Sequence, residues 1–369
     1  MNILVTGANG FIGKNLTAEL ANQSLGEVLP VTRATDRETL EEYCQKADFV
    51  FHLAGVNRPK EEAEFTVGNV DFTGELLGLL KKHGNNCPVM LSSSTQAERD
   101  NPYGQSKQAG EALVFQHGKE TGAEVFVYRF PNVFGKWCRP NYNSAIATFC
   151  HNIARDLPIQ VNDPTVQLQL VHIDDVVQEL IHALAGKANR DGAYCSVPVV
   201  HSETLGNIVA LLQSFRGSRS DRMVPDQGDP FSRKLYSTYL SYLPEDQFSY
   251  PLKMNTDARG SFTEFLKSPE RGQVSVNVSK PGITKGNHWH HTKNEKFLVV
   301  SGQGVIRFRK VGSEEVVDYP VSGDKLEVVD IPPGFTHNIE NVGQTDLVTI
   351  MWANELFDPE RADTWYLEV

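Results

Sequence analysis

Residues 282–302 read GITKGNHWHHTKNEKFLVVSG and place three histidines and a glutamate within eight residues. Side chains two apart in an extended strand lie on the same face, so His288 and His290 are expected to point in the same direction. Glu295 follows after a gap that leaves room for a turn, so its carboxylate can meet this histidine pair from the next strand. This density of imidazole and carboxylate groups is typical of a metal site.

A fourth candidate ligand lies about forty residues further along, where His337 closes the segment PPGFTH. With no cysteine among them, the four candidates His288, His290, Glu295 and His337 make a nitrogen and oxygen site. We therefore expect one divalent metal ion per chain, with Zn²⁺ favoured, although Fe, Mn, Co and Ni accept the same ligand types. The alternative is that the histidines belong to a polar loop.

The spacing of these residues resembles that of the cupins. Residues 282–302 match the first cupin motif, G-x5-H-x-H-x4-E-x6-G, and residues 332–341 match the second half of the other, P-x-G-x-x-H-x-x-x-N. Gly323 lies further from Pro332 than the family pattern has it, which we interpret as a longer loop. The resemblance implies a cupin β-barrel (jelly roll) that holds a metal, and a homodimer formed through that barrel.

Bulk composition sets limits on the class of protein. A chain of 369 residues is expected to form two or three cores, and a net charge of -11 argues against nucleic-acid binding. No apolar run approaches the roughly 20 residues that span a bilayer, and the start, MNILVTGANG, shows no secretory signal. The five cysteines form no C-x-x-C pair. We expect a cytoplasmic protein with reduced thiols and no membrane insertion.

The first residues predict a dinucleotide site. A short apolar strand over residues 2–6 leads into G-x-x-G-x-x-G and then into a helix. Glycines permit a tight turn, and the helix N-terminus offers free N–H groups to a pyrophosphate. The residues expected to bind the cofactor here are Gly7, Asn9, Gly10, Phe11, Ile12 and Gly13.

The second strand predicts which nicotinamide cofactor binds. Residues 27–33 end in Thr32-Arg33, where an NAD-preferring domain would carry an acidic residue for the ribose hydroxyls. Arg33 favours a 2′-phosphate and therefore NADPH. The alternative is a solvated Arg33 with Asp36 binding the ribose.

Two further buried strands are expected to end at the cofactor. The segment DFVFHLAG (48–55) closes in a small-residue turn that passes beside the cofactor at Leu53, Ala54 and Gly55. The segment PVMLSSS (88–94) delivers Ser93 and Ser94 at the carboxyl end of its strand, where ligands bind in such sheets. We expect the hydroxyl of Ser94 to orient the substrate oxygen, with Ser93 as the next candidate for this role.

Tyr103 and Lys107 open the following helix four residues apart, so they share one face. A phenol has a pKa near ~10 and is a poor acid or base at neutral pH. A neighbouring ammonium is expected to lower that pKa toward the working range. Tyr103 and Lys107 are also expected to contact the cofactor.

The motifs TGANGFIG, HLAG, SSS, YGQSK and FPNVFG together resemble the extended short-chain dehydrogenase/reductase family. The resemblance covers about residues 1–245 and implies a Rossmann fold, a doubly wound parallel sheet, with a small substrate lobe for a nucleotide sugar. It also implies that Ser94, Tyr103 and Lys107 are catalytic and that Asn132 contacts substrate. Ser-Thr-Gln at 94–96 replaces the Thr-Asp-Glu of the family's dehydratases, so 4,6-dehydration is not expected.

The boundary between the two domains is expected near residues 243–251, where helical periodicity gives way to short alternating strands. We assign residues 1–245 to the dehydrogenase/reductase domain and residues 246–369 to the cupin domain. Before the boundary, the polar, basic stretch 214–234 is expected to be a turn-rich loop. Its arginines either meet a sugar-nucleotide diphosphate or are solvated.

Residues 257–288 are similar to the deoxysugar 3,5-epimerase branch of the cupins, through the opening DARGSFTE and the step Lys-Gly-Asn-His288. In that branch the histidine removes a proton beside a ketone and a nearby lysine binds substrate. The resemblance implies Lys296 for the lysine, and His288, His290 and His291 are the candidates for the base. Those epimerases need no metal, so His288 is either a ligand or a base.

A reductase joined to such a cupin resembles the bifunctional enzymes of capsular polysaccharide synthesis. The resemblance implies a UDP-linked 2-acetamido-2,6-dideoxy-4-ketohexose that is epimerised at C3 by the cupin and reduced at C4 by NADPH. The product would be a UDP-N-acetyl-6-deoxy-L-talosamine type sugar for capsule or surface polysaccharide. One alternative is a reductase whose cupin is only a dimerising, metal-stabilised scaffold, and another is a sensor that binds NADPH or a nucleotide sugar without turnover.

Overall fold

The computed structural model describes residues 1–369 and divides into two compact units. The first unit comprises Met1–Gln213 and Gln227–Pro244, and the second comprises Ser214–Asp226 and Glu245–Val369. The stretch expected to be a basic loop is partly helical instead, because helix α8 (Leu205–Asp221) continues into it. Residues Ser214–Asp226 of this stretch group with the second unit, and its remaining residues group with the first.

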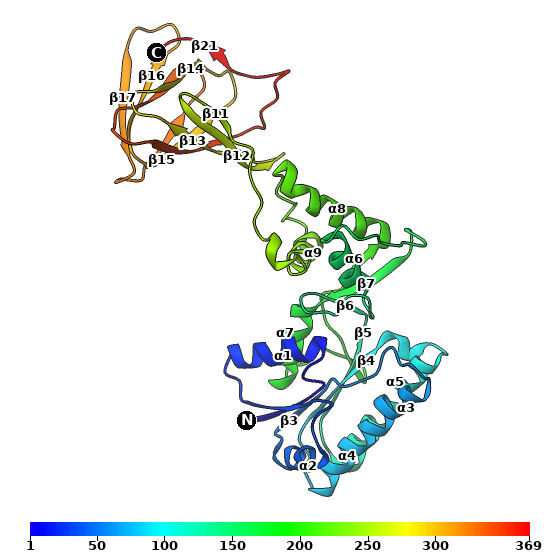
Figure 1. Ribbon diagram of the computed structural model, residues 1–369. Helices are drawn as coiled ribbons and strands as arrows, with labels where there is room; N and C mark the ends of the chain where they lie inside the picture. Colours follow the sequence, from blue (N-terminus) through cyan, green and yellow to red (C-terminus); the bar gives the residue numbers. More distant parts are fainter. The chain divides into compact units, whose positions relative to one another are not determined.

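The first unit is built on a mostly parallel sheet flanked by helices (Figure 1). The strand order of this sheet is β2-β1-β3-β4-β5-β9-β8. Its strands are β1 (Asn2–Thr6), β2 (Glu27–Val31), β3 (Phe49–His52), β4 (Val89–Ser94), β5 (Val125–Phe130), β8 (Arg190–Asp191) and β9 (Tyr194–Cys195). Only the β8–β9 pair is antiparallel. The strand order reverses between β1 and β3, and ligands of such sheets bind outside the carboxyl ends of the strands at this switch point. The predicted Rossmann-like fold of the first domain is confirmed.

Helices cover both faces of this sheet, because the strand residues that point to either face are apolar. Ile3 and Val5 pack with α1 (Phe11–Asn22) and α7 (Ile173–Leu184), whereas Leu4 packs on the opposite face. The helices of that opposite face are α2 (Arg37–Lys46), α4 (Phe72–Lys82) and α5 (Pro102–Thr121). Alternation of buried side chains thus fixes the sheet between two helical layers and aligns the carboxyl ends of its strands.

The segment between β3 and α4 is helical in two parts, α3 (Ala63–Thr66) and a π-helical turn (Val67–Asp71). A short 3-10 turn (Thr95–Glu98) separates β4 from α5. The rest of the first unit contains a second, three-stranded sheet of order β10-β7-β6. Its elements are β6 (Asn132–Phe134), β7 (Gln167–His172), β10 (His201–Thr204), α6 (Ala145–Ile153) and α9 (Pro230–Leu240).

The second unit is all-β after a 3-10 turn (Glu245–Gln247) and consists of two antiparallel sheets (Figure 1). The six-stranded sheet has the order β11-β12-β13-β20-β15-β18, with β11 (Asn255–Asp257), β12 (Gly260–Ser268), β13 (Gly272–Ser279), β20 (Leu347–Ala353), β15 (Glu295–Ser301) and β18 (Val328–Ile331). The five-stranded sheet has the order β17-β16-β19-β14-β21, with β17 (Val316–Ser322), β16 (Gln303–Lys310), β19 (Phe335–Asn341), β14 (Thr284–Trp289) and β21 (Trp365–Tyr366). The predicted all-β second domain is confirmed.

Apolar residues of both sheets meet inside this unit. Phe297 and Val299 of β15 pack in one buried cluster with Ile306 and Phe308 of β16 and with Ile339 of β19. Because these residues alternate with outward-facing neighbours along each strand, their register also decides which polar side chains face inward.

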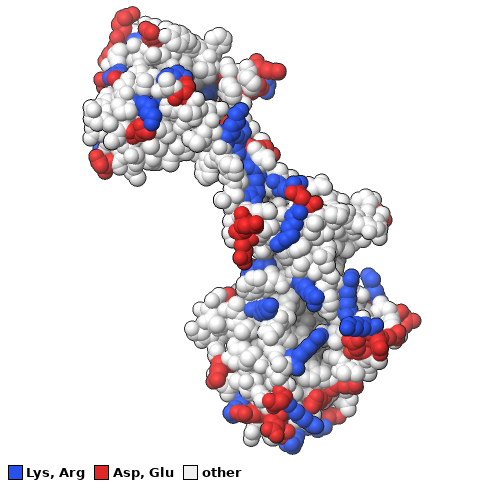
Figure 2. Space-filling view, in the orientation of Figure 1, with Lys and Arg blue, Asp and Glu red and all other residues white.

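The surface carries charges of both signs. On the face shown in Figure 2, acidic and basic side chains are interspersed over both units. None of the helices combines the length and the apolar character that crossing a membrane requires. All five cysteines are buried and unpaired.

Candidate functional site

At two positions of the glycine-rich loop after β1, the backbone tolerates only glycine. Gly7 has a φ of +67°, and a Cβ there would lie 2.8 Å from the backbone nitrogen of Ala54. A Cβ on Gly13 would lie 2.2 Å from the carbonyl oxygen of Gly7. The loop after β1 therefore packs closely against the turn that follows β3. These two strands lie on either side of the switch point.

The N-terminus of α1 is available to an anion. Gly10 is its N-cap residue, and no side chain caps the helix. Asn9 and Gly10 are exposed, and Phe11 and Ile12 are partly exposed. The unpaired N–H groups and the positive end of the helix dipole therefore suit a pyrophosphate, as the sequence predicts.

The turn at Leu53, Ala54 and Gly55 is held by a chain of buried hydrogen bonds. The backbone N–H groups of Leu53 and Ala54 both donate to Oγ1 of Thr6, at 3.1 Å. Oγ1 of Thr6 also lies 2.7 Å from Nδ1 of His52, whose Nε2 lies 2.8 Å from Thr73. Burial lowers the pKa of His52 to about 3, so this imidazole is neutral and serves as a fixed hydrogen-bonding link.

The predicted catalytic residues Ser94, Tyr103 and Lys107 meet beside this turn. Tyr103 and Lys107 lie on the first turns of α5, and the Lys107 amine donates to the carbonyl oxygen of Ser92 at 3.1 Å. A Cβ added to Gly55 would lie 3.0 Å from Nζ of Lys107. Lys107 thus lies directly against the turn expected to bind the cofactor.

The electrostatics of Tyr103 differ from the sequence-based expectation. Burial raises the pKa of Tyr103, and its hydrogen bond with the side chain of Ser94 opposes that rise. Burial lowers the pKa of Lys107 to about 8, opposed by the carboxylate of Glu111. The expected lowering of the phenol pKa is therefore wrong, because desolvation dominates. Tyr103 therefore remains protonated at neutral pH.

The lowered pKa of Lys107 predicts a pH-dependent stability. Below about pH 8 the amine is charged in both the folded and the unfolded state, so folding bears the full cost of burying it. As pH rises from about 8 toward the ordinary value of 10.5, the folded state loses its proton first and this cost falls. Lys107→Met is therefore expected to raise the free energy of unfolding by about 3 kcal/mol at pH 8 and below, and by less as pH rises toward 10.5.

Denaturant unfolding across that pH range, followed at the transition of the first unit, measures the difference in free energy of unfolding between Lys107→Met and the parent protein. Lys119→Met is the matched control, because Lys119 lies on the same helix but is exposed, and it should give no such trend. A Lys107→Met difference that does not vary with pH would contradict the buried-charge interpretation.

Ser93 and Asn132, the other predicted substrate contacts, are placed differently from Ser94. Ser93 is buried and its hydroxyl donates to Glu111, which also pairs with Arg129. Successive side chains of β4 point to opposite faces, so Ser93 points away from the face of Ser94 and has a structural role instead of the predicted one. Asn132 is exposed, and its amide donates to the carbonyl oxygen of Gln169 at 3.1 Å.

The candidate residues for the cofactor ribose lie after β2. Arg33 is exposed. The carboxylate of Asp36 caps α2 by accepting from the backbone N–H of Thr39 at 2.8 Å. Because Asp36 is engaged in this cap, the geometry favours Arg33 over Asp36 as the residue that meets the ribose.

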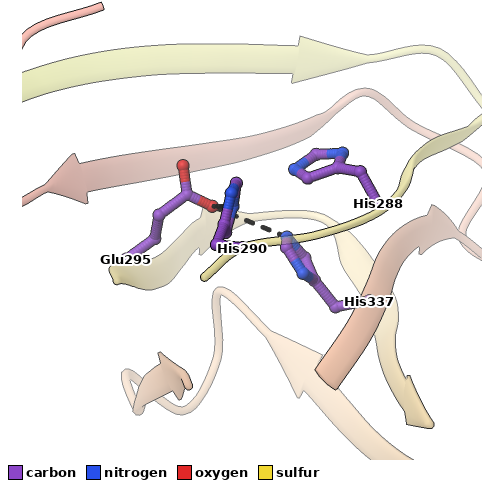
Figure 3. Close-up of side chains that lie close together, drawn as sticks. All are labelled: His288, His290, Glu295 and His337. Atoms are coloured by element: carbon purple, nitrogen blue, oxygen red, sulfur yellow. Dashed lines mark ion pairs between the residues drawn. The ribbon is translucent and has the colours of Figure 1, made fainter. Parts of the chain in front are cut away.

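A second candidate site lies inside the β unit, where His288, His290, Glu295 and His337 come together (Figure 3). Their potential ligand atoms all lie within 4.8 Å of one another. One carboxylate oxygen of Glu295 lies 3.4 Å from Nε2 of His290 and 3.5 Å from Nε2 of His337. These separations are close to ~3.4 Å, the edge of a tetrahedron with ligands about 2.1 Å from a central ion.

The protonation of the cluster suits a metal ion. Nε2 of His290 and both ring nitrogens of His337 are buried without a hydrogen-bond partner, an arrangement that costs free energy unless another group binds them. Burial and the nearby His337 lower the pKa of His288 to about 4, so its imidazole is neutral. Burial alone would raise the pKa of Glu295, but His290, His337 and Lys293 hold it well below its usual range. Neutral imidazoles and an ionised carboxylate are the forms that ligate metals.

A β-bulge brings His288 into the cluster. In the pairing of β14 with β19, Gly286 lies opposite Asn338 and His288 lies opposite His337, so Asn287 is the extra residue. Asn287 has a φ of +58°, which the bulge requires. The bulge places His288, instead of its neighbour, on the inner face opposite His337.

Two residues predicted to be catalytic in this unit face away from the cluster. The His291 ring lies on the other side of the chain, 4.4 Å from the ring of Trp289 and 5.7 Å from that of Trp365. Lys296 is exposed and pairs with Asp330, because it alternates with the inward-facing Glu295 and Phe297 on β15. The geometry therefore contradicts the role predicted for each of them within the cluster.

Two residues that the sequence did not indicate lie at the cluster. Nζ of Lys293 lies 2.9 Å from the carboxylate of Glu295, with the lysine side chain 17% exposed. Asp363 accepts hydrogen bonds from the chain between His290 and Glu295. Lys293 lies in an irregular loop and Asp363 about seventy residues downstream, so neither periodicity nor motif spacing could indicate them.

Comparison with known proteins agrees with this architecture. Residues 3–194 match the NAD dependent epimerase/dehydratase family, and residues 255–365 match the polysaccharide biosynthesis C-terminal domain. A UDP-2-acetamido-2,6-beta-L-arabino-hexul-4-ose reductase from Pseudomonas aeruginosa is 46% identical over 369 residues, which cover 100% of this chain and 99% of that protein.

Solved structures show the same relationship. The capsular polysaccharide assembling protein CapF from Staphylococcus aureus is 58% identical, with a TM-score of 0.96 and 100% of each chain covered. The UDP-glucuronic acid 4-epimerase from Bacillus cereus, solved with NAD, is 22% identical with a TM-score of 0.56, covers 66% of this chain and 96% of its own, and supports the fold alone. The likeness to CapF confirms the predicted resemblance. Because one family match covers residues 3–194, and the Pseudomonas aeruginosa and Staphylococcus aureus relatives match the chain from end to end, the chain belongs to the NAD dependent epimerase/dehydratase family and carries a polysaccharide biosynthesis C-terminal domain.

Proposed function

We propose that the first unit reduces the C4 ketone of a UDP-linked 2-acetamido-2,6-dideoxy-4-ketohexose with NADPH. The observation that carries this proposal is the meeting of Ser94, Tyr103 and Lys107 beside Gly55, next to the switch point of the sheet. The name of the Pseudomonas aeruginosa relative, a reductase of a UDP-linked 4-ulose, supports the same substrate class.

The residues of this site suit proton delivery to a ketone. NADPH, when bound, supplies the hydride that forms the new C–H bond at C4. Tyr103 donates its phenolic proton to the C4 oxygen, and its raised pKa keeps that proton available at neutral pH. Ser94 hydrogen bonds the same oxygen, and Lys107 holds a positive charge beside Gly55. We keep Asn132 as a proposed contact to the sugar.

The proposed preference for NADPH rests on Arg33. Arg33→Ala is expected to weaken NADPH binding by about one to two decades and NADH binding by much less, because a charge-assisted phosphate contact is worth about 1.5–3 kcal/mol. Isothermal titration of each cofactor measures both losses. Arg37→Ala is the matched control, because Arg37 is also exposed on the following helix but pairs with Glu75. Equal losses of NADPH and NADH in Arg33→Ala would contradict the assignment.

We propose that the second unit is a cupin-type barrel that epimerises C3 of the same substrate before reduction. A ketone at C4 acidifies the neighbouring C3–H, so a base removes that proton and a proton returns to the opposite face of C3. The ammonium of Lys293, next to Glu295, takes the role that the resemblance implies for Lys296 and stabilises the negative oxygen of the enolate. His288 is partly exposed while His290 and His337 are buried, so it marks the side from which a sugar approaches.

We propose that His288, His290, Glu295 and His337 hold one divalent ion, with Zn²⁺ as the first candidate. The donor set of three imidazoles and one ionised carboxylate, with buried ring nitrogens that lack partners, supports this. A divalent ion at this position would tie three strands together and would act as a Lewis acid toward a bound oxygen.

Identification of the product by NMR tests the proposal as a whole. The expected product is a UDP-N-acetyl-6-deoxy-L-talosamine type sugar formed from the 4-ketosugar and NADPH. Product reduced at C4 but not inverted at C3, with no deuterium uptake at C3 in D₂O, would show that the barrel is a scaffold. The outward orientation of His291 and Lys296 is the observation that keeps this alternative open. Cofactor binding with no product at all would indicate a sensor.

We further propose that two copies associate through the barrel. The outward face of the six-stranded sheet carries neighbouring apolar side chains from four strands, namely Val276, Ile350, Leu298 and Val328. Ile350 is 36% exposed and Val328 is 59% exposed. An apolar sheet face of this kind supports a homodimer in which it is covered.

A further inference from the structure

The loop between His290 and Glu295 determines how two of the four metal-ligand candidates face each other. Its residues, 291–294, belong to no helix or strand, so no ladder of hydrogen bonds fixes them. A ligand set works only when its side chains are held close to the geometry that the ion requires. The contacts of this loop with the rest of the barrel therefore decide how closely the site matches the geometry that the ion requires.

One carboxylate holds most of this loop. Oδ2 of Asp363 accepts from the backbone N–H groups of Thr292 at 2.8 Å and Lys293 at 2.9 Å. Oδ1 of Asp363 accepts from the backbone N–H of His291 at 2.9 Å. The remaining N–H of the loop, that of Asn294, donates to the side chain of Asn354 at 3.0 Å. Each backbone N–H from His291 to Asn294 is thus bonded to a residue of the chain beyond β20.

The same aspartate orients a ligand ring through its backbone. The carbonyl oxygen of Asp363 lies 2.5 Å from Nδ1 of His290. A carbonyl oxygen only accepts, so Nδ1 carries the proton and Nε2 presents its lone pair toward Glu295 and His337. Asp363 therefore fixes the tautomer of His290 and the path of the chain from His290 to Glu295.

The segment that carries Asp363 is itself anchored beside His288. Strand β21 pairs with β14, with Trp365 opposite Trp289 and Tyr366 opposite His288. The backbone N–H of Leu367 donates to the carbonyl oxygen of Asn287 in the bulge at 3.0 Å. Residues 363–367 therefore contact the chain on both sides of the histidine pair.

We propose that Asp363 is a positioning residue of the metal centre, and that residues 363–367 act as a strap that presets His290 and Glu295 for the ion. This inference rests on the proposed metal site. Outer partners of metal ligands typically contribute about 10–100-fold in metal affinity.

Replacement of Asp363 by asparagine tests the strap with little change in shape. The asparagine has one oxygen in place of two, and its NH₂ group would face a backbone N–H that now donates to Asp363. Asp363→Asn is expected to bind Co²⁺ about 10–100-fold more weakly than the parent protein, measured by competition with a chelator. The visible spectrum of bound Co²⁺ is also expected to change, because it reports the arrangement of ligands around the ion.

The matched control is Asp358→Asn, five residues upstream in the same segment. Asp358 bonds only within its own turn, to the N–H of Glu360 at 3.0 Å and to Arg361 at 3.0 Å, so its replacement should leave Co²⁺ affinity and spectrum unchanged. Thermal unfolding of the metal-free proteins checks that the barrel remains folded. Should Asp363→Asn fail to fold, Asp363→Ala removes the carboxylate without adding a donor and is expected to show the same loss of affinity.

The outcomes separate this inference from the metal site itself. If the parent protein binds Co²⁺ at one site and folded Asp363 variants bind it as tightly and with the same spectrum, the strap has no role in the metal centre and the inference is wrong. If the parent protein binds no Co²⁺, the proposed metal site is wrong and the inference with it. Weaker binding in the Asp363 variants, with Asp358→Asn unchanged, supports both.

Discussion

Tyr103→Phe is expected to lower the rate of ketone reduction by about 10²–10⁴-fold while leaving proton exchange at C3 intact. The phenol is the proposed proton donor to the C4 oxygen, and a positioned general acid contributes about this factor. The ring packs against Phe65 at a centroid distance of 5.6 Å, and phenylalanine keeps that contact. The loss should therefore appear in kcat with little change in cofactor affinity.

Two measurements on the same variant check the division of labour. NADPH oxidation reports reduction, and NMR in D₂O reports deuterium at the carbon beside the ketone. Tyr43→Phe is the matched control, because Tyr43 packs on α2 against the core and its ring is retained. Loss of deuterium uptake in Tyr103→Phe with substrate still bound would show that the two reactions are not independent, and full reductase activity would exclude Tyr103 as the acid.

Removal of the metal is expected to destabilise the second unit selectively. The candidate ligands lie on or next to β14, β15 and β19, so an ion bound to them stabilises only the folded barrel. At an ion concentration 1,000 times the dissociation constant, this linkage is worth about 4 kcal/mol. A chelator should therefore lower the unfolding temperature of the barrel transition, seen by differential scanning calorimetry, and leave the transition of the first unit in place.

Histidine variants identify the residues responsible. His337→Ala should lower the barrel transition without chelator and make it insensitive to chelator, because one ligand is missing. His291→Ala is the matched control, since that ring lies on the outer side against Trp289 and Trp365, and it should respond to chelator as the parent does. A parent protein whose barrel transition is unaffected by chelator, after reconstitution with stoichiometric ion, would contradict the metal site.

The geometry of the candidate nucleotide site follows largely from the sequence because its determinants are local. Glycine is required at Gly7 and Gly13 by contacts within one turn and by the adjacent turn at Ala54. Tyr103 and Lys107 share a face by helical geometry alone. Their pKa values could not be predicted in the same way, because burial depends on the packing of the whole unit, and burial raises the pKa of Tyr103.

The roles of neighbouring residues were less predictable than the motifs. Ser93 and Ser94 are adjacent in a run of three serines, and only the structure shows that Ser93 bonds to the buried Glu111 while Ser94 bonds to Tyr103. The tail of α8 likewise reads as a polar loop, yet its residues from Ser214 onward form a helical segment that groups with the second unit.

The sequence by itself determined the two fold classes, the dinucleotide loop and the four metal-ligand candidates, because spacing along one or two strands sets which side chains share a face. Only the tertiary structure decided which further residues join the metal-ligand cluster. A bulge at Asn287 sets the register that brings His288 opposite His337, and strand alternation puts Lys296 outside while Lys293 pairs with Glu295. Asp363 reaches the loop from about seventy residues away. Such contacts depend on register and on the meeting of distant segments, which no local spacing encodes.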